Sequence, residues 1–193
     1  LSSAQFQALT TAQIAGLDTV HVAALQTADL AALSVDQVRG LGTAAVVALS
    51  AAQLQALTTE QVAALRTSQV AAIEAADLAT METADIAAMG TAQIRAMSSA
   101  QIGALSTDQL TNMGTAQVAA LGTGQIRAIT TAGIAALNDG SITALTSAQV
   151  MGLTTAQVRA ISTASIDALD TVDLAAMRVA QVAAFTGDQI NAL

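Results

Sequence analysis

The chain has 193 residues and a formal net charge of −8, and Arg supplies all six of its cations. The absence of Cys excludes disulfides and thiolate metal sites. An acidic chain with scattered Arg residues repels phosphate backbones, so nucleic acid is not an expected partner. No run of eighteen apolar residues occurs, and a membrane span is therefore not expected.

One octapeptide repeats twenty-four times along the chain without an insertion. Position one is aliphatic, Met or Phe from Leu1 to Leu193, and position six is apolar from Phe6 to Ile190. The working consensus is L-[S/T/G]-T-A-Q-[I/V]-A-A. A fixed short period predicts a stacked repeat architecture, here one array over residues 1–193. Because both ends fall inside the pattern without a capping repeat, we expect a fragment of a longer array or end-to-end association.

A single continuous helix does not suit an eight-residue period. Eight residues advance by roughly 800°, so each octad would arrive about 80° out of phase with the last. Taken in chain order, the octads instead predict a new short helix in each repeat, as in the octads that begin at Leu9, Leu57 and Leu153. In the second of these, Thr58 as N-cap places Gln61 at N3, which forms a capping box, and Leu57 meets Val62 as a hydrophobic staple.

Two registers for the start of each helix are open. The N-cap is position two, as above, or position three, which is Thr in fifteen octads. In the second register, position two follows the preceding helix, where a left-handed conformation suits Gly42, Gly90, Gly114, Gly122 and Asn138. The frequent Thr favours this second register. Both predict helices of five to seven residues separated by one- or two-residue corners.

The predicted fold is therefore an all-α solenoid of very short helices, one per octad. A β-solenoid is the alternative, since short repeats also build β-helices and Thr, Val and Ile favour strands. In a strand, however, positions one and six would point to opposite faces, and the frequent Ala and Gln are poor strand formers.

No motif points to catalysis, a cofactor or a metal. The clearest irregularity, Asn138-Asp139-Gly140-Ser141, partly resembles the start of a calcium loop but lacks the rest of that pattern, so a solvated corner is predicted. His21, the only His, has no second His or Cys and no carboxylate cluster beside it, which predicts a polar surface residue. We expect a non-enzymatic protein without catalytic, cofactor-binding or metal-binding residues.

Position three is the one candidate functional surface. If it faces solvent, identical hydroxyls recur in rows on a rigid scaffold and resemble those of ice-binding proteins; helix capping is the competing explanation. The candidate residues are Thr11, Thr19, Thr27, Thr43, Thr59, Thr67, Thr83, Thr91, Thr107, Thr115, Thr123, Thr131, Thr155, Thr163 and Thr171.

The tandem motif L-[ST]-T-x-Q-[IV]-x-A, as in Leu153–Ala160, resembles octapeptide tracts of very large, repetitive bacterial surface or secreted proteins of adhesin type. The resemblance covers the whole chain. It implies an extracellular or cell-surface setting and a structural role as a stalk, spacer or filament that associates with itself. The alternatives are a Thr-rich surface for ice, a polymer or a host ligand, and a scaffold that binds protein partners.

Overall fold

The computed structural model describes residues 2–193, which form helices and no strands. Each of the twenty-four octads contributes one helix of four to six residues. The predicted all-α array of very short helices is thus confirmed, and the β-solenoid alternative is wrong.

The helices fall into two units, residues 1–97 and 98–193, each with twelve helices. The first unit holds α1 (Ser3–Gln7), α2 (Thr11–Ala15), α3 (Thr19–Ala23), α4 (Thr27–Ala32), α5 (Val35–Gly40), α6 (Thr43–Val47), α7 (Ala51–Gln55), α8 (Thr59–Ala64), α9 (Thr67–Ala72), α10 (Ala75–Leu78), α11 (Thr83–Ala88) and α12 (Thr91–Ala96). The second holds α13 (Ser99–Ala104), α14 (Thr107–Thr111), α15 (Thr115–Ala120), α16 (Thr123–Ala128), α17 (Thr131–Ala136), α18 (Asp139–Thr143), α19 (Ser147–Gly152), α20 (Thr155–Ala160), α21 (Thr163–Asp167), α22 (Thr171–Ala176), α23 (Val179–Val182) and α24 (Gly187–Ala192).

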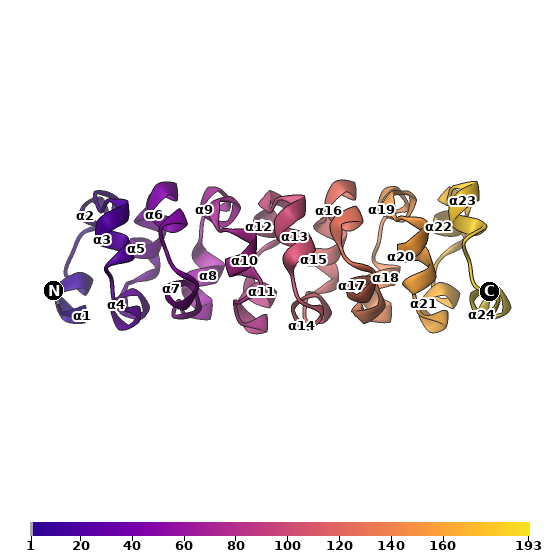
Figure 1. The fold of residues 1–193 in the computed structure, drawn as a ribbon, viewed down its shortest axis with the longest axis horizontal. Helices are drawn as coiled ribbons and strands as arrows, with labels where there is room; N and C mark the ends of the chain where they lie inside the picture. The colour runs from indigo at the N-terminus through magenta and orange to yellow at the C-terminus, as the bar shows by residue number, and fades with distance from the viewer. Residues whose placement is uncertain (1) are drawn as a thin grey trace. The chain divides into compact units, whose positions relative to one another are not determined.

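Within each unit, every helix packs on the helix three octads later. In the first unit α2 packs on α5 and α6 on α9; in the second, α13 packs on α16 and α16 on α19 (Figure 1). Three octads therefore complete one turn, a number that the sequence alone left open. The helices of a unit line up in three columns, and residues 24 apart occupy equivalent places in successive turns.

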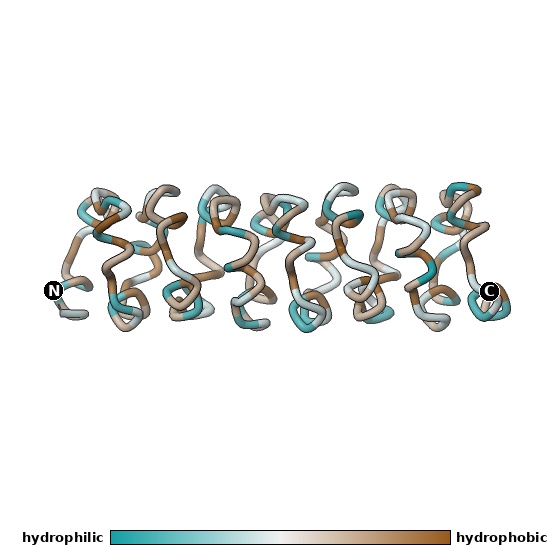
Figure 2. Tube along the Cα trace, viewed as in Figure 1, coloured by the Kyte–Doolittle hydropathy of each residue, from teal (hydrophilic) through white to brown (hydrophobic). Residues whose placement is uncertain are grey.

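Positions one and six form the core of each unit. Val62 is fully buried and Leu57 is 4% exposed. Figure 2 shows hydrophobic segments, in brown, recurring along the tube. A helix this short is not stable alone, and burial of a Leu or Val side chain returns only about 1.5–3 kcal/mol. The stacking of turns is what makes these helices persist.

Two extended residues form the corner that follows a six-residue helix such as α4. Leu33 (φ −64°, ψ 145°) and Ser34 (φ −69°, ψ 159°) lie between α4 and α5. The Leu33 N–H donates to the Leu30 carbonyl at 3.1 Å, which closes the end of α4. No residue in the described range 2–193 has a positive φ. The left-handed conformation suggested for position two is therefore wrong, since the five residues concerned are all extended N-caps: Gly42, Gly90, Gly114, Gly122 and Asn138.

Candidate functional site

The start of each helix is fixed by position two. Thr58 is the N-cap of α8, and its Oγ1 accepts a hydrogen bond from the Gln61 N–H at 3.3 Å. In return, Gln61 Oε1 accepts from the Thr58 N–H at 2.7 Å, which completes the predicted capping box. The second register is therefore wrong, because position three is the first residue within the helix and leaves the capping to its neighbour.

Glutamine completes its half of the box even where position two has no hydroxyl. The Gly90 N–H donates to Gln93 Oε1 at 2.7 Å, and the Arg66 N–H donates to Gln69 Oε1 at 2.8 Å. A glycine offers no side chain for the forward bond, so the Gln alone satisfies one free N–H of the helix start.

The same glutamines also join one turn to the turn before it. Gln61 Nε2 donates to the Leu30 carbonyl at 3.0 Å and the Leu33 carbonyl at 2.7 Å. These acceptors lie 31 and 28 residues earlier, at the end of α4 and the corner that follows it. Within each unit the spacing recurs for Gln37, Gln53, Gln61, Gln69, Gln93, Gln149, Gln157, Gln181 and Gln189.

We call these bonds the glutamine ladder. Both ends of the Gln61 amide are engaged, and the residue is only 2% exposed. Burying an amide is costly unless its hydrogen bonds are made, and here one side chain satisfies an N–H above and two carbonyls below. The sequence predicted the capping half but missed the second half. The signal was the persistence of Gln where position two is Gly or Arg.

Asp at position five bonds in a different direction. Ser3 Oγ donates to Asp29 Oδ1 at 2.7 Å and Thr59 Oγ1 donates to Asp85 Oδ1 at 2.9 Å. The same spacing of 26 residues joins Ser147 to Asp173. A carboxylate cannot donate to carbonyls, so it accepts from the position-three hydroxyl of the previous turn instead.

One pair reverses these roles. Ser165 occupies position five, and its hydroxyl donates to the carboxylate of Asp139 at position three of the previous turn. Asp139, the most irregular residue of the sequence, thus has a structural role as a partner for the next turn. Asn138 caps α18 through the Ser141 N–H at 2.8 Å, so the expected solvated corner is an ordinary octad with polar substitutions.

Two carboxyl groups have shifted pKa values. Burial raises the pKa of Asp85, opposed by the Thr59 hydrogen bond and reinforced by the nearby Glu82 charge. The pKa of Asp18 is lowered, first by the hydrogen bond from the backbone N–H of His21. The His21 ring lies 2.7 Å from Asp18 and is largely exposed, as predicted for a polar surface residue. These are local effects, and the two carboxyl groups lie far apart in the chain.

The candidate Thr residues are solvent-facing, with only Thr83 half-buried. The structure does not gather them into one face, because successive octads belong to different columns. The longest row in one unit is Thr19, Thr43, Thr67 and Thr91, on α3, α6, α9 and α12. Among the candidates, Thr59 has the inter-turn role described above.

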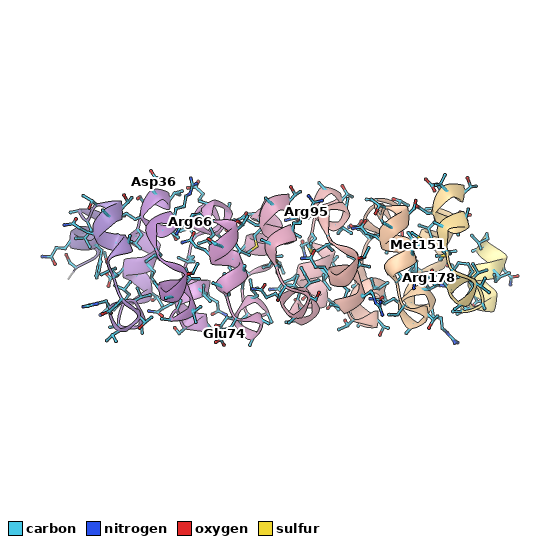
Figure 3. The ribbon with its side chains drawn as sticks, turned by 90° about the horizontal axis from the view of Figure 1, so that it is seen from above. Asp36, Arg66, Glu74, Arg95, Met151 and Arg178 are labelled. Carbon is cyan, nitrogen blue, oxygen red and sulfur yellow. The ribbon has the colours of Figure 1, made fainter. Side chains whose placement is uncertain are left out.

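The outer surface carries the scattered charges. Asp36, Glu74 and Arg95 are exposed, and Asp36 and Glu74 lie at the upper and lower edges of the view in Figure 3. Arg66 also reaches back to donate to the Leu41 carbonyl at 2.9 Å. Within residues 2–193 no three His, Cys, Asp or Glu side chains are placed to hold a metal ion. None of the helices in this range is both long and apolar enough to span a bilayer.

The ALTTAQ repeat family matches the chain in six overlapping segments: residues 22–59, 46–75, 70–107, 78–115, 104–130 and 118–155. Together these cover residues 22–155, well over half of the chain. The chain belongs to the ALTTAQ repeat family. The motif itself stands at Ala8–Gln13, where Thr10 is the N-cap and Gln13 completes the box. A search of curated proteins gave no match.

Proposed function

We propose that this chain is a non-enzymatic structural segment, a stalk, spacer or filament-forming part of a bacterial surface or secreted protein. The glutamine ladder is the observation that carries the proposal. Buried polar side chains are common in active sites, yet the buried glutamines of this chain bond to the backbone of the turn before them, and Asp29, Asp85 and Asp173 accept from its hydroxyl groups. The buried polar groups of the array therefore hold successive turns together.

Self-association belongs to the same proposal. The bonds that join turns involve backbone carbonyls and a Gln amide, so any turn built from the same octads can make them. A second copy of the chain is therefore the expected partner. Electron microscopy of the purified chain over a range of concentrations tests this. Particle length that grows with concentration supports a filament and a fixed length supports a spacer, whereas compact particles without a long axis would contradict both.

The surface setting needs a separate test. Antibodies raised against the purified chain should label intact cells of the producing bacterium. Labelling that appears only after the cells are permeabilised would overturn the extracellular part of the proposal and leave the structural part standing.

A Thr-rich binding surface is the second candidate. It gains support because the position-three hydroxyls are exposed and are not used for capping, which was the competing explanation. Replacement of Thr19, Thr43, Thr67 and Thr91 by Val should leave the melting temperature nearly unchanged. Thermal hysteresis that is present in the parent and lost in the variant would support ice binding, whereas no hysteresis in either would remove it.

A further inference from the structure

Ser141 has a side-chain hydroxyl group without a hydrogen-bond partner. It occupies position five in α18 and is fully buried. Its Oγ is the only buried side-chain polar atom within residues 2–193 that has no hydrogen-bond partner. Its backbone N–H is already engaged by the Asn138 side chain and carbonyl. The side-chain hydroxyl is therefore the one group of Ser141 whose hydrogen bond is missing.

Two backbone carbonyls beneath Ser141 also lack the donor that a Gln would supply. By the spacing of the glutamine ladder, residue 141 lies over Leu110 and Met113. One octad later, Gln149 Nε2 donates to the equivalent Val118 and Leu121 carbonyls at 3.0 and 2.7 Å. Met113 is 2% exposed, and no hydrogen bond from residues 2–193 reaches its carbonyl. Among residues 2–193, the Leu110 carbonyl accepts only from the Met113 N–H, at 3.2 Å.

We propose that one water molecule binds at this corner and replaces the missing glutamine amide. Its two hydrogens would go to the Leu110 and Met113 carbonyls, as the two Nε2 hydrogens of a Gln do, and its oxygen would accept from the Ser141 hydroxyl. The serine side chain has three fewer heavy atoms than that of glutamine, and the water oxygen would stand in place of the missing amide nitrogen. Three polar partners are the usual number for a buried water.

Two other position-five residues of the second unit that replace Gln, Gly133 and Ser165, differ from Ser141. At Gly133, a Cβ atom would lie 2.6 Å from Leu110 Cδ1 and 2.8 Å from Ile129 Cγ2, so apolar side chains already fill that space. At Ser165, the hydroxyl is used by Asp139. A metal cation is a poor occupant of the Ser141 corner, because hard cations take six or more oxygens and favour carboxylates.

The direct test is a crystal structure of the full chain at a resolution that shows ordered water. The expected result is one water within hydrogen-bonding distance of Ser141 Oγ and both carbonyls. Density in which the Ser141 hydroxyl bonds to a carbonyl of its own turn, with the corner closed, would overturn the proposal. So would a cation at this position, which a melting temperature that differs between sodium, potassium and ammonium salts would reveal.

Two variants give an independent readout. Ser141→Gln should displace the water, place its amide on the Leu110 and Met113 carbonyls, and raise the melting temperature. Ser141→Ala removes the hydroxyl and should lower the melting temperature by about 2–4 °C, the shift expected for roughly 1 kcal/mol in a chain of this size. Ser68→Ala, at an exposed Ser, is the matched control and should change nothing. A melting temperature unaffected by Ser141→Ala would also count against the bound water.

Discussion

The corner beneath Gln61 and the corner beneath Ser141 are built on the same backbone and held by different means. At the first, one buried amide caps its own helix and bonds to Leu30 and Leu33 in the turn before. At the second, Asn138 caps the helix and no side chain reaches the preceding turn. Yet Ile142 at position six is 1% exposed, nearly as deeply buried as Val62. Capping and the aliphatic core therefore determine the backbone conformation of each turn. The glutamine ladder adds stability to that conformation.

The first prediction breaks the core, which both corners share. Val118→Asp should lower the free energy of unfolding by at least about 3 kcal/mol, because it places an unpaired charge at a fully buried position. Urea unfolding measures the loss. Val179→Asp makes the same chemical change at a side chain that is 88% exposed and should cost far less. Similar losses in the two variants would mean that position six is not the core.

The second prediction isolates the ladder. Gln61→Glu keeps the oxygen that accepts from Thr58 but loses the donor to Leu30 and Leu33 and buries a charge, so a loss of about 1–3 kcal/mol or more is expected. Gln13→Glu is the matched control, because Gln13 is exposed and makes only the capping box. Chemical denaturation of the two variants compares them, and equal losses would remove the ladder as a source of stability.

The third prediction concerns a corner without a side chain at position five. Gly133→Ala should destabilise by about 1–3 kcal/mol, because its Cβ would meet Leu110 Cδ1 at 2.6 Å. Leu110→Val alone should cost roughly 0.5–1.5 kcal/mol. In the double variant the contact with Leu110 Cδ1 is gone and only the contact with Ile129 Cγ2 remains, so the combined loss should be smaller than the sum of the two. Strict additivity in a double-mutant cycle would show that Leu110 does not occupy that space.

Much of one octad could be predicted from sequence because its signals are local. The capping box of Thr58 and Gln61 and the apolar positions one and six need only their neighbours in the chain. The number of octads per turn depends on how helices stack, which no single octad encodes. The series Asp29, Asp77 and Asp173 recurs at multiples of three octads, but Arg95, Arg127 and Arg159 recur at four, so neither series predicts the turn.

The role of position three was misjudged for a physical reason. Thr is a good N-cap, and its frequency there favoured capping. Position two, however, holds Ser, Thr, Asp or Asn often enough to cap most helices, which leaves the position-three hydroxyl free. In Thr59 that hydroxyl serves the next turn through Asp85. Such a bond joins residues 26 apart and has no local signature.

The fourth prediction compares two adjacent Thr residues. Thr10 caps α2, whereas Thr11 is exposed and follows it. Thr10→Ala should lower stability by about 1 kcal/mol through loss of the cap, and Thr11→Ala should stay within about 0.5 kcal/mol of the parent. Thermal unfolding of the two variants measures this. A larger loss from Thr11→Ala would restore the register with position three as the N-cap.

The fifth prediction has the smallest expected effect. It separates corners with Asp at position five (acid corners) from corners with an amide side chain there (amide corners). Burial raises the pKa of Asp85, so the folded protein binds this proton more tightly than the unfolded chain does. The stability that comes from protonated Asp85 is fully present below its ordinary pKa of 3.8 and is lost as the pH rises through the raised folded value.

Asn at this position stays neutral at every pH and can still accept from Thr59. Asp85→Asn should therefore be more stable than the parent at pH 7, and the advantage should shrink as the pH falls towards the ordinary pKa. Unfolding measured across this pH range checks it, with Asp36→Asn at an exposed carboxyl as the control. An advantage that grows as the pH falls would mean that the Thr59 hydrogen bond outweighs burial, and that acid corners hold their turns through the charged form.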